Sequence, residues 1–343
     1  MPPVEEGRRI LTICNACRYC EGFCAVFPAI ESRPQFSGAD LDYLANLCHN
    51  CGECYYACQY APPHAFAVNV PQVLAQVRLD SYRRYARPRW FARFYRNSGE
   101  LAIATAALAF VAGLALSPVG GTTFYDIVPH SVMVGIFGVA ALLILAALLV
   151  STAGQFAGIP KLNRPALARA ARSMLTLKYL GSGGAGCTYP GEHHSMARRW
   201  FHHFTFYGFL LCFASTCVAA WNHFALKRIA PYPYLSLPVV LGILGGAGLL
   251  AGPAGLYLLK RQRASALADT RQDALDLTFL ALLFATSLTG LLLLLLRQSV
   301  WMRPLLLIHL ATVLALFATL PYGKFVHGIY RAAALLRYAI EKK

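Results

Sequence analysis

Residues 14–24 read CNACRYCEGFC and residues 48–58 read CHNCGECYYAC, so one spacing of four cysteines occurs twice near the N-terminus. Each run has the form Cys-x2-Cys-x2-Cys-x3-Cys. This spacing is typical of proteins that hold two [4Fe–4S] clusters, in which the fourth cysteine of each run ligates the other cluster. A zinc ribbon is the alternative, but it needs only two Cys-x2-Cys pairs, whereas each run here supplies four thiols.

The pattern predicts two sets of four iron ligands. For the first cluster we predict Cys14, Cys17, Cys20 and Cys58. For the second cluster we predict Cys24, Cys48, Cys51 and Cys54. The proline that usually follows the fourth cysteine is absent from both runs, which puts the local turn in question but not the ligands. Residues 40–46, between the runs, have a helical pattern, so we expect a helical ferredoxin-like domain.

The rest of the chain is far more apolar than this domain. The whole chain has 343 residues, of which 57% are hydrophobic and only 13% are charged. An average soluble domain has about 25% charged residues. A helix needs about 20 apolar residues to cross a bilayer. The long uncharged runs therefore predict a mainly α membrane protein with about six spans, near 101–117, 131–150, 203–221, 237–259, 275–296 and 304–322.

The distribution of Lys and Arg predicts the orientation. The loop 118–130 has neither residue, whereas the loop 151–202 is rich in both, Lys161 among them, and so is the C-terminal segment up to Lys343. The positive-inside rule then places both termini in the cytoplasm, in a bacterial inner membrane. We also expect no signal peptide, because residues 1–12 lack an apolar stretch, and cytoplasmic thiols stay reduced for metal binding.

These features predict a domain organisation. We expect a two-cluster domain over 1–70, a basic juxtamembrane linker over 71–100, a cytochrome b-like bundle over 101–330 with the cytoplasmic loop 151–202, and a basic tail over 331–343. The Arg- and aromatic-rich linker suits an anionic lipid surface. The net charge of +16 is explained by such flanking segments, and we expect no nucleic-acid partner.

Histidines on or beside the spans are candidate haem ligands, because haem b in a helix bundle takes two axial histidines from facing helices. Near the cytoplasmic side we predict that His202 or His203 pairs with His327 to hold an inner haem. About five whole turns separate His309 from His327, so we expect both on one face of the sixth helix.

The same pattern predicts a second, outer haem. His309 would pair with His223 or His130 near the opposite side of the membrane. For His130 and His223 an equal alternative is that they lie at the membrane interface and do not bind haem. Of the remaining cysteines, Cys212 and Cys217 are interpreted as small core residues. Cys187, in a Gly-rich loop, is interpreted as part of a docking loop for a partner.

Several stretches resemble the tricarballylate (citrate) utilisation protein B family. They are residues 13–22, 48–52, 59–64, 186–190, 198–203, 211–216 and 321–328, the last reading PYGKFVHG. The resemblance implies two [4Fe–4S] clusters, haem b and a soluble FAD-dependent tricarballylate dehydrogenase as partner, which oxidises tricarballylate to cis-aconitate. It further implies that this chain reoxidises the partner's FADH2 and passes electrons to the quinone pool.

Two other functions fit parts of the pattern. A heterodisulfide-reductase-like or nitrate-reductase-like subunit would serve a different dehydrogenase. A membrane anchor or transporter with redox-sensing clusters would need no electron transfer, but a transporter predicts charged residues in mid-span, which the expected spans lack. We see no flavin, molybdenum or nucleotide motif, so we expect no substrate-dehydrogenating site in this chain alone.

Overall fold

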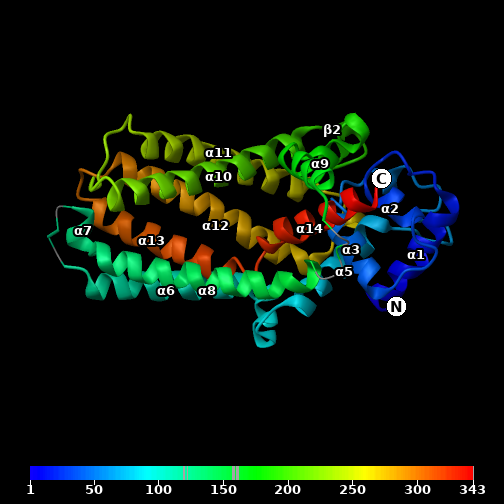
Figure 1. Ribbon diagram of the computed structural model, residues 1–343, viewed down its shortest axis with the longest axis horizontal. Helices are drawn as coiled ribbons and strands as arrows, with labels where there is room; N and C mark the ends of the chain where they lie inside the picture. Colours follow the sequence, from blue (N-terminus) through cyan, green and yellow to red (C-terminus); the bar gives the residue numbers. More distant parts are fainter. Residues whose placement is uncertain (119, 122, 157–158, 160–161, 343) are drawn as a thin grey trace.

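The computed structural model describes residues 1–118, 120–121, 123–156, 159 and 162–342. Lys161 of the predicted loop 151–202 and Lys343 of the C-terminal segment lie outside the described residues. The described part is mainly helical, with a single two-stranded antiparallel sheet. Figure 1 shows an elongated molecule in which a bundle of long helices carries a smaller domain of short helices at one end.

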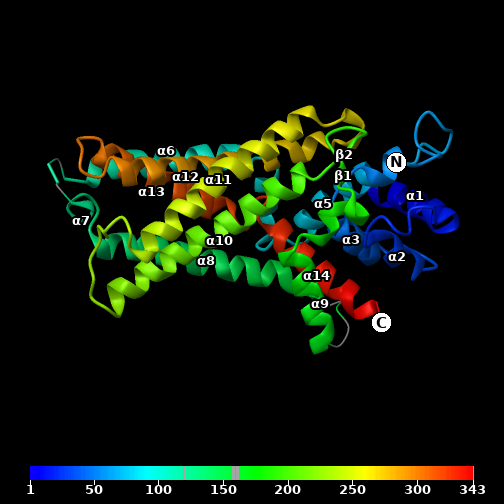
Figure 2. The ribbon, with the colours of Figure 1, turned by 90° about the horizontal axis from the view of Figure 1, so that it is seen from above.

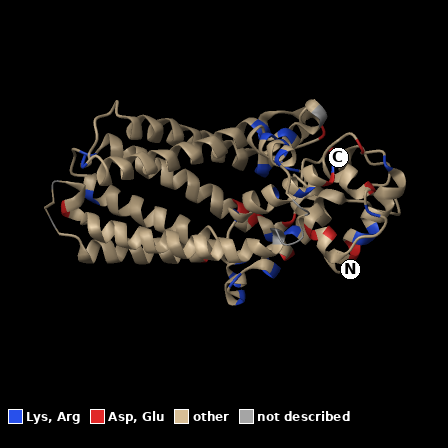
Figure 3. Ribbon diagram, viewed as in Figure 1, with Lys and Arg blue, Asp and Glu red and all other residues tan. Residues whose placement is uncertain are grey.

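Six helices of the described part are long and apolar enough to span a membrane, which confirms the predicted number. They are α6 (Ser98–Leu116), α8 (His130–Phe156), α10 (Ala197–Phe224), α11 (Leu237–Gln262), α12 (Thr270–Leu295) and α13 (Met302–Thr319). Figure 3 shows that the middle of this bundle is almost free of charged residues, which gather at its ends. A short helix, α7 (Phe124–Ile127), lies at the far end.

Helices α10 and α11 pack side by side along much of their length (Figure 2). Small residues allow the close approach, since a Cβ added at Gly245 would lie 2.7 Å from Cys212 Sγ and 2.8 Å from its backbone nitrogen. Close backbone contact of this kind is common between membrane helices, where the hydrophobic effect adds little to helix association. Cys212 therefore packs as predicted, whereas Cys217 is exposed on the bundle surface, so the core interpretation is wrong for Cys217.

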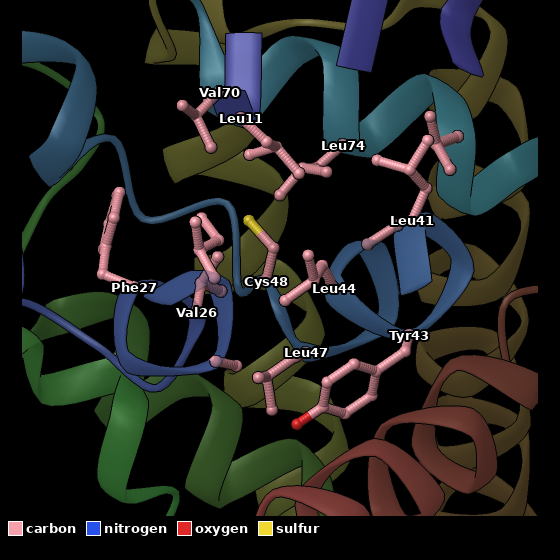
Figure 4. Packing of buried hydrophobic residues seen from close by; sticks show 14 of the residues in the cluster. Leu11, Val26, Phe27, Leu41, Tyr43, Leu44, Leu47, Cys48, Val70 and Leu74 are labelled. Atoms are coloured by element: carbon pink, nitrogen blue, oxygen red, sulfur yellow. The ribbon is translucent and has the colours of Figure 1, made fainter. Parts of the chain in front are cut away.

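The cysteine-rich domain consists of five helices around one apolar core. They are α1 (Pro3–Cys17), α2 (Val26–Glu31), α3 (Gly38–Leu47), α4 (Glu53–Tyr56) and α5 (Val70–Tyr85). Leu11, Leu41, Leu44 and Leu74 are fully buried at the centre of this core (Figure 4). Helix α3 confirms the helix expected between the cysteine runs, and a reciprocal Ser37–Asp40 capping box begins it.

The prediction that a linker begins at residue 71 is wrong. Val70, Val73, Leu74 and Val77 have helical spacing and are buried in the domain core, and Pro71 is tolerated in the first turn of α5. The connection to the bundle is short, with the 3-10 helix η1 (Arg89–Tyr95) as its main element.

The prediction of a C-terminal tail is also wrong. Helix α13 ends at Thr319, and a new helix, α14 (Val326–Glu341), packs against α3 and against α9 (Arg164–Leu175). Its residues Val326 and Tyr330 are fully buried. Both termini lie at the cysteine-rich end of the molecule (Figure 1), in agreement with an even number of spans.

The loop between α8 and α10 is folded. After α9 it continues as a 3-10 helix, η2 (Lys178–Gly184), and as the hairpin of β1 (Cys187–Thr188) and β2 (His194–Ser195). A last 3-10 helix, η3 (Ser265–Leu267), connects α11 to α12. The hairpin contacts α4 of the cysteine-rich domain, and η2 contacts α10 of the bundle. The segment between α8 and α10 therefore contributes to both parts of the molecule.

Candidate metal-binding sites

The first predicted group of cysteines surrounds a small cavity. Cys14, Cys17, Cys20 and Cys58 line this space of about 30 Å³, together with Cys54. Helix α1 carries Cys14 and Cys17 in its last turn, and it ends because Arg18 takes a left-handed conformation with φ of 57°. Burial raises the pKa of the Cys14 thiol to about 12, and the nearby thiols of Cys20, Cys58 and Cys17 add to the shift.

The second predicted group surrounds a separate cavity of about 10 Å³, lined by Cys24, Cys48, Cys51 and Cys54. Burial raises the pKa of Cys54, and the neighbouring thiols of the same group add to the shift. Because Cys54 lines both cavities, the two groups adjoin each other. The structure thus brings together the cysteines that spacing alone assigned to each set, although they come from segments far apart in the chain.

The donor chemistry fits iron–sulfur clusters. All eight cysteines have free thiols, and thiolates are the ligands that such clusters take. The eight thiols line two adjoining cavities, five at the first and four at the second, with Cys54 lining both. The assignment of ligands to clusters stays a prediction, and this arrangement supports it.

The two groups differ in their position relative to the bundle. In the first group Cys17 is exposed, and Tyr19 beside it is 68% exposed. In the second group Cys48 and Cys51 are buried, as is His49 between them. The first group therefore faces the surface of the domain and the second faces the membrane helices, an order that the sequence did not reveal.

His202 and His327 form a close pair at the end of the bundle nearest the second group. Their ring centroids lie 6.1 Å apart. Two imidazoles on opposite sides of a metal, each about 2 Å from it, would place their centroids about 6 Å apart. The Nδ1 atom of His327 lies 2.6 Å from the carbonyl oxygen of Lys324, so it can donate there and leave Nε2 for a metal. This donor set fits the predicted inner haem.

His203 is less suited to that role. Its ring stacks on Tyr207, with centroids 5.7 Å apart, and lies 6.1 Å from that of Trp200. The sequence left His202 and His203 as alternatives, and the structure favours His202.

The expectation that His309 and His327 share one helix is wrong. Helix α13 ends before Pro321, because proline lacks the backbone N–H that would continue the ladder, and His327 lies on α14. His309 faces α12 instead, with its Nδ1 atom 3.0 Å from the Thr289 hydroxyl oxygen.

The predicted outer pairing of His309 with His223 or His130 has no support in this arrangement. The two alternative partners, His130 and His223, stack on each other with ring centroids 3.7 Å apart. Within the described part of the chain, no ring contact joins His309 to either of them. The outer haem stays a prediction without support from the geometry.

A cavity of about 150 Å³ lies between the second cysteine group and the bundle. Lys324 Nζ is 2.6 Å from Asp276 Oδ1, and Lys260 Nζ is 2.7 Å from Asp276 Oδ2, so a carboxylate of the fifth span is paired twice. Burial lowers the pKa of Lys324 to about 8. Sequence reasoning counted the lysines as loop charges and missed this network. The cavity is lined by His49, Arg78, Arg198, His202, Lys260, Asp276, Lys324, His327 and Arg331, among others.

The hairpin after η2 covers the second cysteine group. Cys187 is fully buried in a cluster with Cys51, and its thiol donates to the carbonyl oxygen of Leu180 at 3.1 Å. Gly52 has φ of +86°, and a Cβ added there would lie 2.5 Å from the carbonyl oxygen of Thr188. Cys187 itself is fully buried and cannot contact a partner directly, whereas Gly184 and Ala185 of the same loop are exposed, so the interpretation of this segment as a docking loop stays a prediction.

The fold and the sites define a class: a mainly helical protein that has, in its described part, six membrane-length helices and a ferredoxin-like domain. Comparison with known families is more specific. Residues 7–84 match the "Citrate utilization protein B Fer4-like domain" and residues 92–343 match "Citrate utilization protein B". The chain belongs to the citrate utilization protein B family.

A relative from Escherichia coli supports this assignment. The chain is 49% identical over 353 aligned residues to the citrate utilization protein B of that organism, covering 99% of this chain and 93% of the relative. No solved structure matches the chain.

Proposed function

We propose that this chain is the membrane electron-transfer subunit of a dehydrogenase system. It reoxidises the FADH2 of a partner tricarballylate dehydrogenase and passes the electrons through two [4Fe–4S] clusters and haem b to the quinone pool. The observation that carries the proposal is the order of the sites. The first cysteine group faces the surface, the second adjoins it, and the His202–His327 pair lies beyond, at the end of the bundle.

The residues of the chain have distinct roles in this proposal. Clusters and haem supply one-electron chemistry, which matches a two-electron flavin to a two-electron quinone. The exposed side of the first group, around Cys17 and Tyr19, is where a flavoprotein can approach most closely. The buried second group is shielded by the hairpin that carries Cys187, so its electrons are protected from solvent oxidants.

The six membrane-length helices of the described part of the chain support a route that ends at a bilayer. We propose that the protein resides in a bacterial inner membrane with the cysteine-rich domain in the cytoplasm. The reduced thiols and the Lys- and Arg-rich segments beside that domain support this orientation. The substrate of the partner rests on the family, in which the members are described as citrate utilization proteins.

The test begins with the intact chain, purified anaerobically in detergent. We expect about eight non-haem irons per chain with matching acid-labile sulfide, and one haem b. Addition of the reduced flavoprotein should reduce the haem, and addition of a short-chain quinone should reoxidise it. Zinc in place of iron would overturn the proposal. Clusters that the flavoprotein cannot reduce would favour a passive anchor, and reduction by a different dehydrogenase alone would favour the heterodisulfide-reductase-like or nitrate-reductase-like alternative.

A further inference from the structure

Three arginines from three different helices converge on the segment that begins the second cysteine run. Arg78 of α5 donates its Nε to the carbonyl oxygen of Ala45 and its Nη2 to that of Cys48, both at 2.7 Å. Arg331 of α14 donates its Nη2 to the same Cys48 oxygen, also at 2.7 Å. We name Arg78, Arg198 and Arg331 the arginine clamp.

The third member comes from a membrane-length helix. Arg198 of α10 donates to the carbonyl oxygens of Asn50, at 2.7 Å, and of His49, at 2.9 Å. Its guanidinium group also lies over the ring of Tyr189, 4.5 Å from the centroid. The arginine clamp thus ties the cysteine-rich domain to both α10 and α14, and it fixes the backbone on both sides of Cys48.

The charges of the arginine clamp lack carboxylate partners. All three residues line the cavity of about 150 Å³, and Arg78 is only 4% exposed. Among the described residues, none of the three forms an ion pair with Asp or Glu, and Asp276 in the same cavity is already paired with Lys260 and Lys324. Buried cations are costly unless an anion compensates them, so the neighbouring second site is the place for that anion.

A four-iron cluster held by four thiolates is such an anion, and it gains one further negative charge on reduction. Nearby cations therefore stabilise the reduced form more than the oxidised form, and charge is one of the factors that set a cluster's potential. Among the residues lining the second cavity, Glu53 is the sole carboxylate, and His194 Nε2 lies 3.0 Å from it. No member of the arginine clamp lines either cysteine cavity, but Arg78 and Arg331 both donate to the carbonyl oxygen of Cys48, a residue of the second group.

We propose that the arginine clamp makes the second cluster the more easily reduced of the two, so that electrons entering at the first are drawn toward the membrane bundle. The inference rests on the proposed function for the presence of the two clusters. It assigns Arg78, Arg198 and Arg331 as positioning residues that set the direction of transfer, and none of them is required as a ligand.

The experiment is a redox titration of the full chain in detergent, followed by electron paramagnetic resonance. Arg331→Gln should lower the midpoint potential of one cluster and leave the other unchanged, whereas Arg331→Lys should stay close to wild type because it keeps the charge. We expect about a tenfold change in the equilibrium between the clusters, about 59 mV for a one-electron couple. The matched control is Arg169→Gln, since Arg169 also donates to a backbone oxygen, that of Ala339 at 2.9 Å, but away from both cysteine groups.

Cys17→Ser, which removes a predicted ligand of the first cluster, identifies the paramagnetic resonance signal that belongs to that cluster. Wild-type potentials in Arg331→Gln and Arg198→Gln would overturn the inference, and so would a shift confined to the cluster that Cys17→Ser alters. If Arg331→Gln fails to load iron, Arg198→Gln and the lysine variant decide by the same criterion. Absence of clusters from the wild-type protein would instead refute the proposed function, so the two failures are distinguishable.

Discussion

The rings of His202, on α10, and His327, on α14, lie with their centroids 6.1 Å apart at the junction of the bundle and the cysteine-rich domain. Their closeness depends on the break after Thr319, which ends α13 and starts a second helix in a new direction. If the pair holds the inner haem, His202→Ala and His327→Ala should each abolish the b-type absorbance of the purified chain. His203→Ala is the matched control and should retain it, because its ring stacks on Tyr207 instead. Full haem content in His327→Ala would contradict the assignment.

Gly52 is expected to tolerate no side chain. Its φ of +86° disfavours any other residue, and an added Cβ would lie 2.5 Å from the carbonyl oxygen of Thr188. Gly52→Ala should therefore destabilise the protein by about 1–3 kcal/mol and push the hairpin away from Cys51. Thermal unfolding and iron content measure both effects. Gly22→Ala is the control, because nothing lies within 4 Å of a Cβ added there.

The close packing of α10 on α11 is expected to contribute to the stability of the bundle. Gly245→Val places two methyl groups where Cys212 Sγ is already 2.7 Å from an added Cβ, so the helices must separate. We expect a loss of about 1–3 kcal/mol, seen as a lower thermal midpoint in detergent by circular dichroism. Gly135→Val, on the open face of α8, should leave the midpoint unchanged. Equal midpoints for the two variants would show that the close approach contributes nothing.

The contact between α14 and the cysteine-rich domain should weaken in acid. Arg33 Nη2 lies 2.6 Å from Glu341 Oε1, and Arg337 Nε lies 2.8 Å from the same oxygen. Burial acts to raise the pKa of Glu341, but the hydrogen bonds and charges of the two arginines outweigh it, so this pKa lies below its ordinary value of 4.5. The carboxylate therefore stabilises the folded state fully above pH 4.5, and this contribution is lost as the pH falls through the lowered value.

Hydrogen exchange of α14 between pH 7 and pH 3, corrected for intrinsic rates, measures this effect. Protection should fall toward the acid end in the wild type, and Glu341→Gln should be less protected at neutral pH with a smaller change. Glu5→Gln, at an exposed position of α1, serves as control. Identical pH profiles for wild type and Glu341→Gln would contradict the prediction.

The candidate site was only partly predictable. Cysteine spacing assigned all eight thiols to two sets, because three of the four ligands predicted for each cluster are close in the chain and their spacing reflects the shape of one cubane face. The sequence paired the inner histidines only as His202 or His203 with His327, and left this choice open, because a pair forms between helices whose relative placement no local pattern encodes. The arginine clamp was missed altogether. Arg78 was assigned to a lipid-facing linker and Arg331 to a tail, since a basic residue near an apolar run resembles a membrane flank until its partners are seen.

The sequence by itself determined the elements of this protein whose cause is local. The number of membrane-length helices in the described part follows from the thickness of a bilayer, and the prediction of two cysteine sets follows from ligand geometry. Tertiary structure alone decided that α5 and α14 belong to the cysteine-rich domain, that His202 rather than His203 meets His327, and that the second cysteine group faces the bundle. Those outcomes depend on the path of the chain between distant segments, where burial and helix termination decide which surfaces meet.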